Sequence, residues 1–159
     1  MVRLRQAAMA HYGIAAGAPF RLLGVACGLP RSGKTTWALQ QNVPMVDPDS
    51  IRLAFQGRPY IRETEEWIWS ITRLMVRSLF FAGHQDVIVQ GVNATPEHRM
   101  QWMANDLWFP VFCVFQTPAD VCIARAKKNV RNDLISVIPH LARSWKPPEA
   151  HEGPVLIIS

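Results

Sequence analysis

The chain has 159 residues, of which 49% are hydrophobic and 18% are charged, and its formal net charge is +5. Such a composition is typical of a globular domain with a buried core, and it excludes a disordered chain. No apolar run approaches the roughly 20 residues that span a bilayer, so we expect no membrane partner. The three cysteines show no metal-ligand spacing, and we expect them to be reduced, buried thiols of a cytoplasmic protein.

No aspartate or glutamate precedes Asp47, so part of the positive charge lies near the N-terminus. Basic charge favours polyanions such as nucleic acid or phosphorylated metabolites, although ordinary surface lysines and arginines produce the same balance. We expect residues 1–19 to form an N-terminal extension, as a short helix or a loosely held arm. A single domain over residues 20–159 would follow it.

The first motif is a phosphate-binding loop. Residues 21–26 are an apolar run typical of a buried strand, and residues 35–41 have helical spacing. Between them, GLPRSGKTT at 28–36 matches G-x-x-x-x-G-K-[ST] at every fixed position. A glycine turn between strand and helix directs backbone N–H groups into one concavity, which suits a nucleoside triphosphate. We expect Lys34 to reach the β- and γ-phosphates and the Thr35 hydroxyl to bind Mg²⁺. The candidate nucleotide-binding residues are Gly28, Arg31, Ser32, Gly33, Lys34, Thr35 and Thr36.

The rest of the chain alternates strands and helices. Strands are predicted over 43–47, 86–90, 110–115 and 155–158, and helices from residue 48 and over 62–82, 96–105, 119–128 and 133–145. Apolar residues in the long helix recur every three or four positions, and we expect their face to pack on the sheet. They are Trp67, Ile68, Ile71, Leu74, Met75, Ser78 and Leu79. This alternation predicts an α/β fold of three layers, with a central parallel sheet and ligands at the carboxyl ends of its strands.

The exit of the second predicted strand, DPDSIR at 47–52, bears on the reaction. The Asp49 carboxylate would lie beside the γ-phosphate, where it would accept the proton of an attacking hydroxyl group. Arg52, one helical turn later, would hold an acidic substrate by a bidentate contact. The alternative is that Asp49 or Ser50 caps the helix and that Arg52 is solvated.

These motifs together resemble the polynucleotide 5′-kinase and zeta-toxin-like branch of P-loop phosphotransferases, which includes small stand-alone AAA-type ATP-binding proteins. The likeness runs from about residue 21 to residue 149. It rests on the phosphate loop with Trp37-Ala38, on residues 47–52, on VIVQGVN at 87–93 with PEHR at 96–99, and on CIAR at 122–125. The resemblance implies a P-loop NTPase fold with sheet order 2-3-1-4-5, a helical lid, and ATP and Mg²⁺ as cofactors.

The resemblance also implies roles for single residues. Three would be catalytic: Lys34 stabilises the transferring phosphoryl group, Asp49 is the general base, and Arg125 is the lid arginine that neutralises charge in the transition state. Two would bind the acceptor: Arg52 contacts its phosphate, and the loop that holds Asn93 lies near it.

Two departures from the family pattern bear on activity. The family has an aspartate at the exit of the third strand, which helps to hold Mg²⁺, where this chain has Gln90-Gly91-Val92. A second lid arginine is replaced by Asn129, although Lys127, Lys128 or Arg131 would substitute for it. Both changes predict weaker metal binding, slower transfer or a different acceptor.

The sequence thus leads to the hypothesis of an ATP-dependent kinase that phosphorylates a hydroxyl group, with the 5′-hydroxyl of DNA or RNA as the leading acceptor. One alternative is a kinase of zeta-toxin or antibiotic-phosphotransferase type with a small phosphorylated acceptor. The other is a non-catalytic ATP-binding module that acts through a partner. The oligomeric state stays open.

Overall fold

The computed structural model describes residues 1–58 and 60–158, so positions 59 and 159 of the expected domain lie outside the described residues. Its centre is a five-stranded sheet of order β2-β3-β1-β4-β5, in which every pair is parallel. The strands are β1 (Leu22–Cys27), β2 (Met45–Val46), β3 (Asp86–Val89), β4 (Phe109–Phe115) and β5 (Val155–Ile158). The order expected from the resemblance is confirmed.

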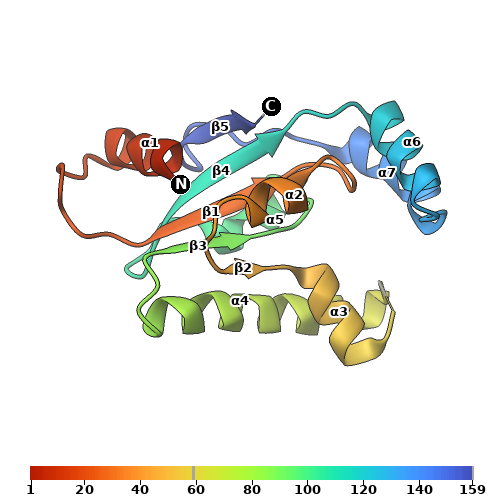
Figure 1. The fold of residues 1–159 in the computed structure, drawn as a ribbon, viewed down its shortest axis with the longest axis horizontal. Helices are drawn as coiled ribbons and strands as arrows, with labels where there is room; N and C mark the ends of the chain where they lie inside the picture. The colour runs from red at the N-terminus through yellow and green to blue at the C-terminus, as the bar shows by residue number, and fades with distance from the viewer. Residues whose placement is uncertain (59, 159) are drawn as a thin grey trace.

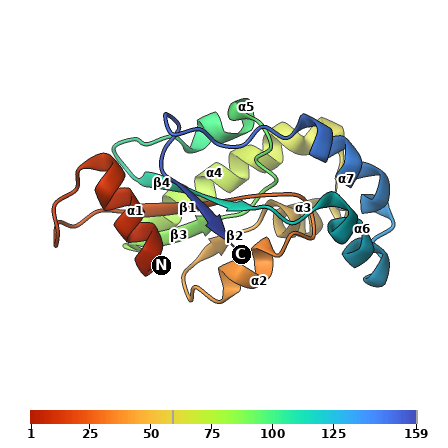
Figure 2. The same ribbon diagram turned by 90° about the horizontal axis from the view of Figure 1, so that it is seen from above.

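Helices cover both faces of the sheet and extend beyond its carboxyl edge (Figures 1 and 2). One face carries α1 (Val2–Tyr12) and α2 (Lys34–Leu39), and the other carries α4 (Glu65–Phe81), α5 (Pro96–Arg99) and the 3₁₀ turn η2 (Met100–Trp102). Beyond the carboxyl ends of the strands lie α3 (Pro48–Gln56), the turn η1 (Arg62–Thr64), and the lid helices α6 (Ala119–Lys128) and α7 (Asp133–Ser144). Residues of α6 and α7 form a separate apolar cluster with Leu29 of the phosphate loop.

The first residues form a short helix, α1, one of the two forms expected for residues 1–19, and this helix packs on the sheet. Leu4 and Ala8 of α1 are buried against the sheet. Arg5 forms an ion pair of 3.0 Å with Asp86 at the start of β3, and the Tyr12 hydroxyl donates to the carbonyl of Pro110. The arginine that suggested a basic arm is therefore tied to a carboxylate of the sheet.

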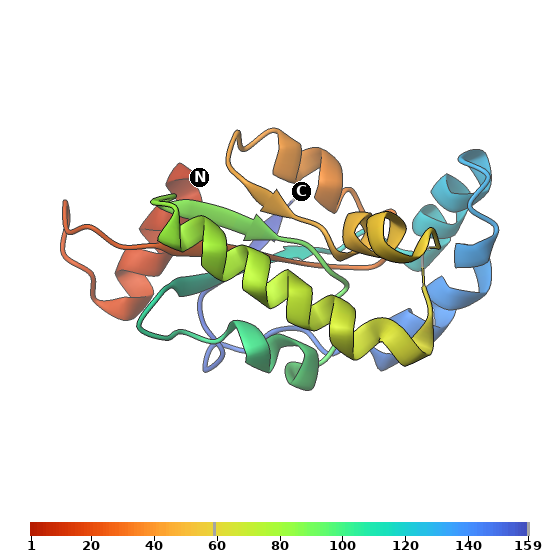
Figure 3. The ribbon, with the colours of Figure 1, turned by 90° about the horizontal axis from the view of Figure 1, so that it is seen from below.

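Helix α4 lies across one face of the sheet (Figure 3), and the side that packs there matches the predicted face only in part. Its buried residues recur every four positions: Ile68, Thr72, Val76 and Phe80. Of the predicted face, Ile68 is buried and Ile71 and Leu79 pack against the core. Trp67, Leu74 and Met75 are exposed. The prediction was wrong for these three because the helix carries apolar residues on two sides, about 100° apart.

The cap of α3 also differs from the expected one. The Asp47 carboxylate accepts hydrogen bonds from the backbone N–H of Asp49 and from the Ser50 hydroxyl, at 3.1 and 3.0 Å. Pro48 occupies the first helical position, where its missing N–H has no cost. Because Asp47 is the cap, the Asp49 carboxylate is available for other contacts.

In the described part of the chain, no helix combines the length and apolar character needed to cross a membrane. All three cysteines are free and buried, as predicted.

Candidate nucleotide and acceptor site

The turn between β1 and α2 has the geometry of a phosphate loop. Gly33 has a φ of 106°, a conformation that side chains with a Cβ rarely adopt. At Gly28, an added Cβ would lie 2.9 Å from both the Phe115 Cβ and the Ser32 Oγ. Only glycine fits at these two positions, so the backbone N–H groups at the start of α2 face the concavity unobstructed.

Lys34 is a buried cation that lacks a carboxylate partner in the described residues. Its side chain Nζ donates to the carbonyls of Gly28 and Leu29 and to the Ser32 hydroxyl. Burial lowers the pKa of Lys34 to about 8, although the negative charge of Asp49 opposes this shift. The nearby Arg31 Nε is also buried without a hydrogen-bond partner. A polyphosphate would satisfy both groups, so these residues fit the predicted ligand.

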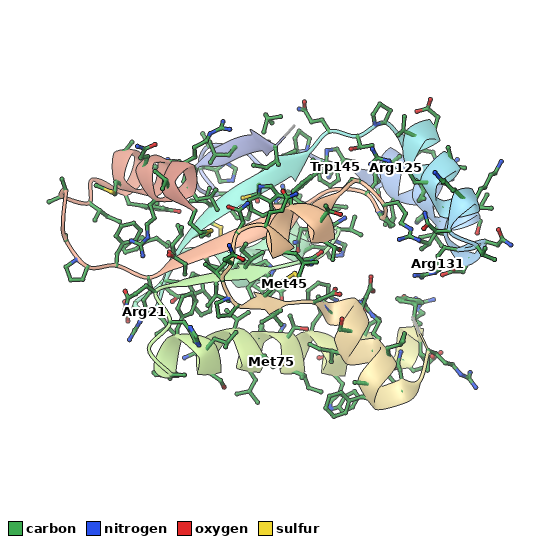
Figure 4. All side chains as sticks on the ribbon, viewed as in Figure 1. Arg21, Met45, Met75, Arg125, Arg131 and Trp145 are labelled. Carbon is green, nitrogen blue, oxygen red and sulfur yellow. The ribbon has the colours of Figure 1, made fainter. Side chains whose placement is uncertain are left out.

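A pocket of about 780 Å³ opens over this loop, which is large enough for a nucleotide. Its walls include residues 31–37, residues 115–117 after β4, the lid residues Arg125 and Asn129, and the end of β5. Arg125 donates to the Arg31 carbonyl at 3.1 Å, so the lid already reaches the phosphate loop. Figure 4 shows Arg125 on the lid at the carboxyl end of the sheet. The structure thus brings the predicted residues 31–36 and Arg125 to one pocket.

The candidate Mg²⁺ ligand Thr35 contacts Gln90, which lies in the segment where the resembled family has an aspartate. Its hydroxyl donates to the Gln90 Oε1 at 2.9 Å, and the Gln90 amide nitrogen contacts the Met45 sulfur. The site therefore supplies a hydroxyl and a neutral amide oxygen. Both are oxygen ligands, and they fit Mg²⁺ only with phosphate oxygens and water completing its shell.

Asp49 and Arg52 lie outside the nucleotide pocket, in a separate cluster of charges. The Arg52 Nη1 contacts the Asp49 carboxylate at 2.6 Å. On its other side, the guanidinium makes a bidentate pair with Glu65 of α4, at 2.7 and 2.6 Å, and it lies over the ring of Trp69. The Arg52 side chain is only 11% exposed, whereas that of Asp49 is 76% exposed. One arginine thus faces two carboxylates, and Asp49 remains accessible.

Asn93 is placed beneath the site. It is buried, with a φ of 48°, and its amide nitrogen donates to the Ala26 carbonyl at 2.9 Å. The neighbouring Val92 carbonyl accepts from the N–H of Gly28. These bonds attach the exit loop of β3 to the end of β1, and a contact between Asn93 and the acceptor stays a prediction.

The lid offers further basic groups. Arg131 pairs with Asp133, and this hydrogen bond raises the pKa of Arg131, with a smaller contribution from the charge of Asp49. Figure 4 shows Arg125 and Arg131 on the same end of the molecule. Asn129 donates to the Arg125 carbonyl within α6, so it supports the helix in place of a second lid arginine.

The sequence did not reveal Glu65 or the ion pair between Arg99 and Glu152. Each joins residues that are distant in sequence: Glu65 is 13 residues from Arg52, and Arg99 is 53 residues from Glu152. No local spacing links such residues. Trp102 and Trp108 are buried in the core, so neither is exposed for stacking on a base.

Comparisons with known proteins agree with this geometry. A family model described as an AAA domain matches residues 23–140, well over half of the chain. No curated protein sequence matches the chain.

Many solved structures are similar to this chain, among them the following three. A candidate kinase from Chloroflexus aurantiacus has a TM-score of 0.66 at 17% identity, over 89% of this chain and 86% of that one. A chain of the Pnkp1/Rnl/Hen1 RNA repair complex has a TM-score of 0.62 at 20% identity over 82% of this chain, which spans 48% of that one. A gluconokinase from Sinorhizobium meliloti has a TM-score of 0.53 at 17% identity, over 89% and 83% of the two chains. At these identities the likeness establishes a shared fold, that of P-loop kinases.

Proposed function

This chain belongs to the AAA domain family, and from that premise we propose that it is a phosphotransferase that moves the γ-phosphoryl group of ATP to a hydroxyl group. One observation carries the proposal. Lys34 is buried in a glycine-lined loop with only neutral oxygens around its Nζ, and the accessible Asp49 carboxylate lies in the first turn of α3, which follows β2 at the same edge of the sheet. A phosphate cradle and a nearby base are the parts that phosphoryl transfer needs.

In the proposed reaction, Asp49 accepts the proton of the acceptor hydroxyl. The hydroxyl oxygen then forms a bond to the γ-phosphorus, and the bond to the bridging oxygen breaks, so that ADP leaves with the electron pair. Lys34 and Arg125 stabilise the charge on the transferring group. Mg²⁺, held by Thr35 and the phosphate oxygens, would supply further neutralisation of this charge.

The first candidate acceptor is the 5′-hydroxyl of DNA or RNA. The net charge of +5 supports it, as do exposed basic residues around the site, including Arg58, Arg62, Lys127 and Lys128. In this case the phosphate of the acceptor would approach Arg52, and Arg52 would have to exchange one carboxylate for that phosphate.

The second candidate is a small hydroxyl compound, and the charge cluster favours it. Arg52 is already paired with Asp49 and Glu65, so the cluster carries one positive and two negative charges. A phosphate next to it would meet a net negative charge, whereas a neutral hydroxyl compound would not.

The test is transfer of labelled γ-phosphate to a 5′-hydroxyl oligonucleotide and, separately, to a panel of neutral polyols. We expect Asp49→Asn to abolish transfer while ATP binding persists. With the first acceptor, Glu65→Gln would free Arg52 and raise kcat/KM for the oligonucleotide by about 10-fold, or about 1.4 kcal/mol. Glu63→Gln, an exposed change two residues away, is the matched control.

Each outcome assigns the function. Label on the oligonucleotide supports the first acceptor, and label only on a polyol supports the second. ATP binding without transfer to either would contradict the proposed reaction with these acceptors, and it would favour a non-catalytic module in which Gln90 replaces the metal-holding acid.

A further inference from the structure

Helix α4 carries a second, mainly apolar stripe whose side chains are largely exposed, apart from Ile71, which also packs against the core. Its inner face, which packs on the sheet, has its residues at intervals of four. The outer stripe has alternating intervals of four, three, four and three: Trp67, Ile71, Leu74, Ser78 and Phe81. Three of these side chains are largely exposed, Trp67 at 48%, Leu74 at 63% and Phe81 at 70%. These three apolar side chains, at intervals of seven residues, therefore face solvent.

Neighbouring residues widen this surface. Phe55 of α3 is 60% exposed and packs edge-on against Trp67, with ring centroids 5.3 Å apart. Met75, labelled on α4 in Figure 4, is 43% exposed. Monomeric proteins rarely leave connected apolar groups of this kind in water, and such groups mark sites of association.

We propose that the outer stripe of α4 packs against the same stripe of a second copy of this chain, with the two helices antiparallel. Alternating intervals of three and four are the spacing by which helices pack along one another at a shallow angle. A stripe that contacts its own copy gives a closed two-fold dimer, the commonest symmetric assembly. In the antiparallel register, Ile71 lies opposite Leu74, and the bulky Trp67 lies opposite the small Ser78.

The charged residues beside the outer stripe favour an antiparallel orientation of the two α4 helices. Glu66, Arg73 and Arg77 are spaced by seven and four, so they follow the same side of the outer stripe. The acidic residue lies near the start of α4 and the basic residues lie further along it. An antiparallel copy places Glu66 near Arg77 of the second copy, and does so twice. A parallel copy would place these charged residues on opposite sides of the dimer, where Glu66 and Arg77 could not pair, and it would align the two helix dipoles unfavourably.

The expected association is weak. A helix of 17 residues is roughly 25 Å long, and one such stripe buries less than the about 800 Å² per partner of a standard interface. Dimerisation should therefore depend on protein concentration in the micromolar range.

The test is sedimentation velocity on the full chain, from about 1 to about 500 μM, a range that spans weak affinities. We expect a dimer at the higher concentrations, which Leu74→Glu reduces to a monomer. Glu66→Arg and Arg77→Glu should each weaken the dimer by 10-fold or more, and the double variant Glu66→Arg/Arg77→Glu should restore it. Val2→Glu, on an exposed residue of α1 on the opposite face of the sheet, should leave the dimer unchanged.

Because the substituted side chains lie on the surface, the variants should keep the unfolding temperature of the wild type. A chain that stays monomeric at every concentration overturns the proposal and leaves the stripe to another partner. A dimer that survives Leu74→Glu, or one that the double charge exchange does not restore, overturns it as well.

Discussion

Arg99 is expected to be the most sensitive single residue for stability. It is fully buried, and all five N–H donors of its guanidinium are used. Two donate to the Glu152 carboxylate at 2.7 and 2.8 Å. The other three donate to the carbonyls of Asn93, Lys146 and Pro147. Arg99 therefore joins the exit loop of β3 to the segment between α7 and β5.

The change Arg99→Met tests this role, because methionine keeps much of the side-chain volume and removes the charge and the donors. Glu152, only 4% exposed, would then be a buried charge without its partner, which costs about 3–5 kcal/mol. A domain of this size loses about 2–4 °C of unfolding temperature per kcal/mol, so we expect a fall of about 6–20 °C. This is a large part of a typical folding free energy of about 5–15 kcal/mol.

Urea denaturation and calorimetry measure the change, with Arg131→Met as the matched control. The side chains of Arg131 and Asp133 are 39% and 47% exposed, so breaking their pair should cost less than about 1 kcal/mol. The double variant Arg99→Met/Glu152→Met should be less destabilised than Arg99→Met alone, because no unpaired charge remains. If Arg99→Met stays within about 1 kcal/mol of the wild type, the reasoning about this buried pair is refuted.

The same pair predicts an acid-sensitive component of stability. Burial alone would raise the pKa of Glu152, but hydrogen bonds from Arg99 and from the N–H of Glu149 outweigh it and hold this pKa below 4.5. The stabilisation is thus complete above pH 4.5 and is lost as the pH falls through the folded-state pKa. Urea midpoints measured between about pH 7 and pH 3 should fall more steeply for the wild type than for the double variant.

Other predictions concern the site. Gln90→Glu places a carboxylate beside the Thr35 hydroxyl and should lower the Mg²⁺ concentration for half-maximal rate by about 10-fold; an unchanged Mg²⁺ dependence would contradict a role for this position in metal binding. Arg125→Ala should lower kcat by about 10³-fold, whereas Lys127→Ala, an exposed change on the same helix, should change kcat little. Equal effects of the two variants would argue against Arg125 as the lid arginine. Lys34→Met should abolish ATP binding that calorimetry can detect. The same change should lower the free energy of unfolding of the free protein by no more than about 2 kcal/mol, because it removes a cation that is costly to bury.

Much of the nucleotide site was predictable because its signals are local. The phosphate loop depends on glycines and a lysine within nine consecutive residues, and the turn requires them whatever surrounds it. Strand and helix alternation likewise predicted the parallel sheet, although its order came from the resemblance to known kinases. The helices over residues 62–82 and 96–105 proved shorter, with 3₁₀ turns at η1 and η2.

The charge cluster of Asp49, Arg52 and Glu65 was predictable only in part. Asp49 and Arg52 are one turn apart, so their proximity follows from the helix. No spacing in the sequence indicates that Glu65, at the start of α4, pairs with Arg52, and this contact changes the expected chemistry of the acceptor. Asn93 shows the same limit: the resemblance implied that its loop lies near the acceptor, whereas its side chain turns inward to the Ala26 carbonyl.

The sequence by itself thus determined the elements and the phosphate loop, because hydrogen bonds within a helix or turn link residues a few positions apart. Only the tertiary structure decided which of the two apolar stripes of α4 meets the sheet, how α1 is held, and which carboxylates hold Arg52 and Arg99. These outcomes depend on packing and on charge pairs between segments that are far apart in the chain. Their free energies depend on burial, and no spacing in the sequence specifies which groups will be buried together.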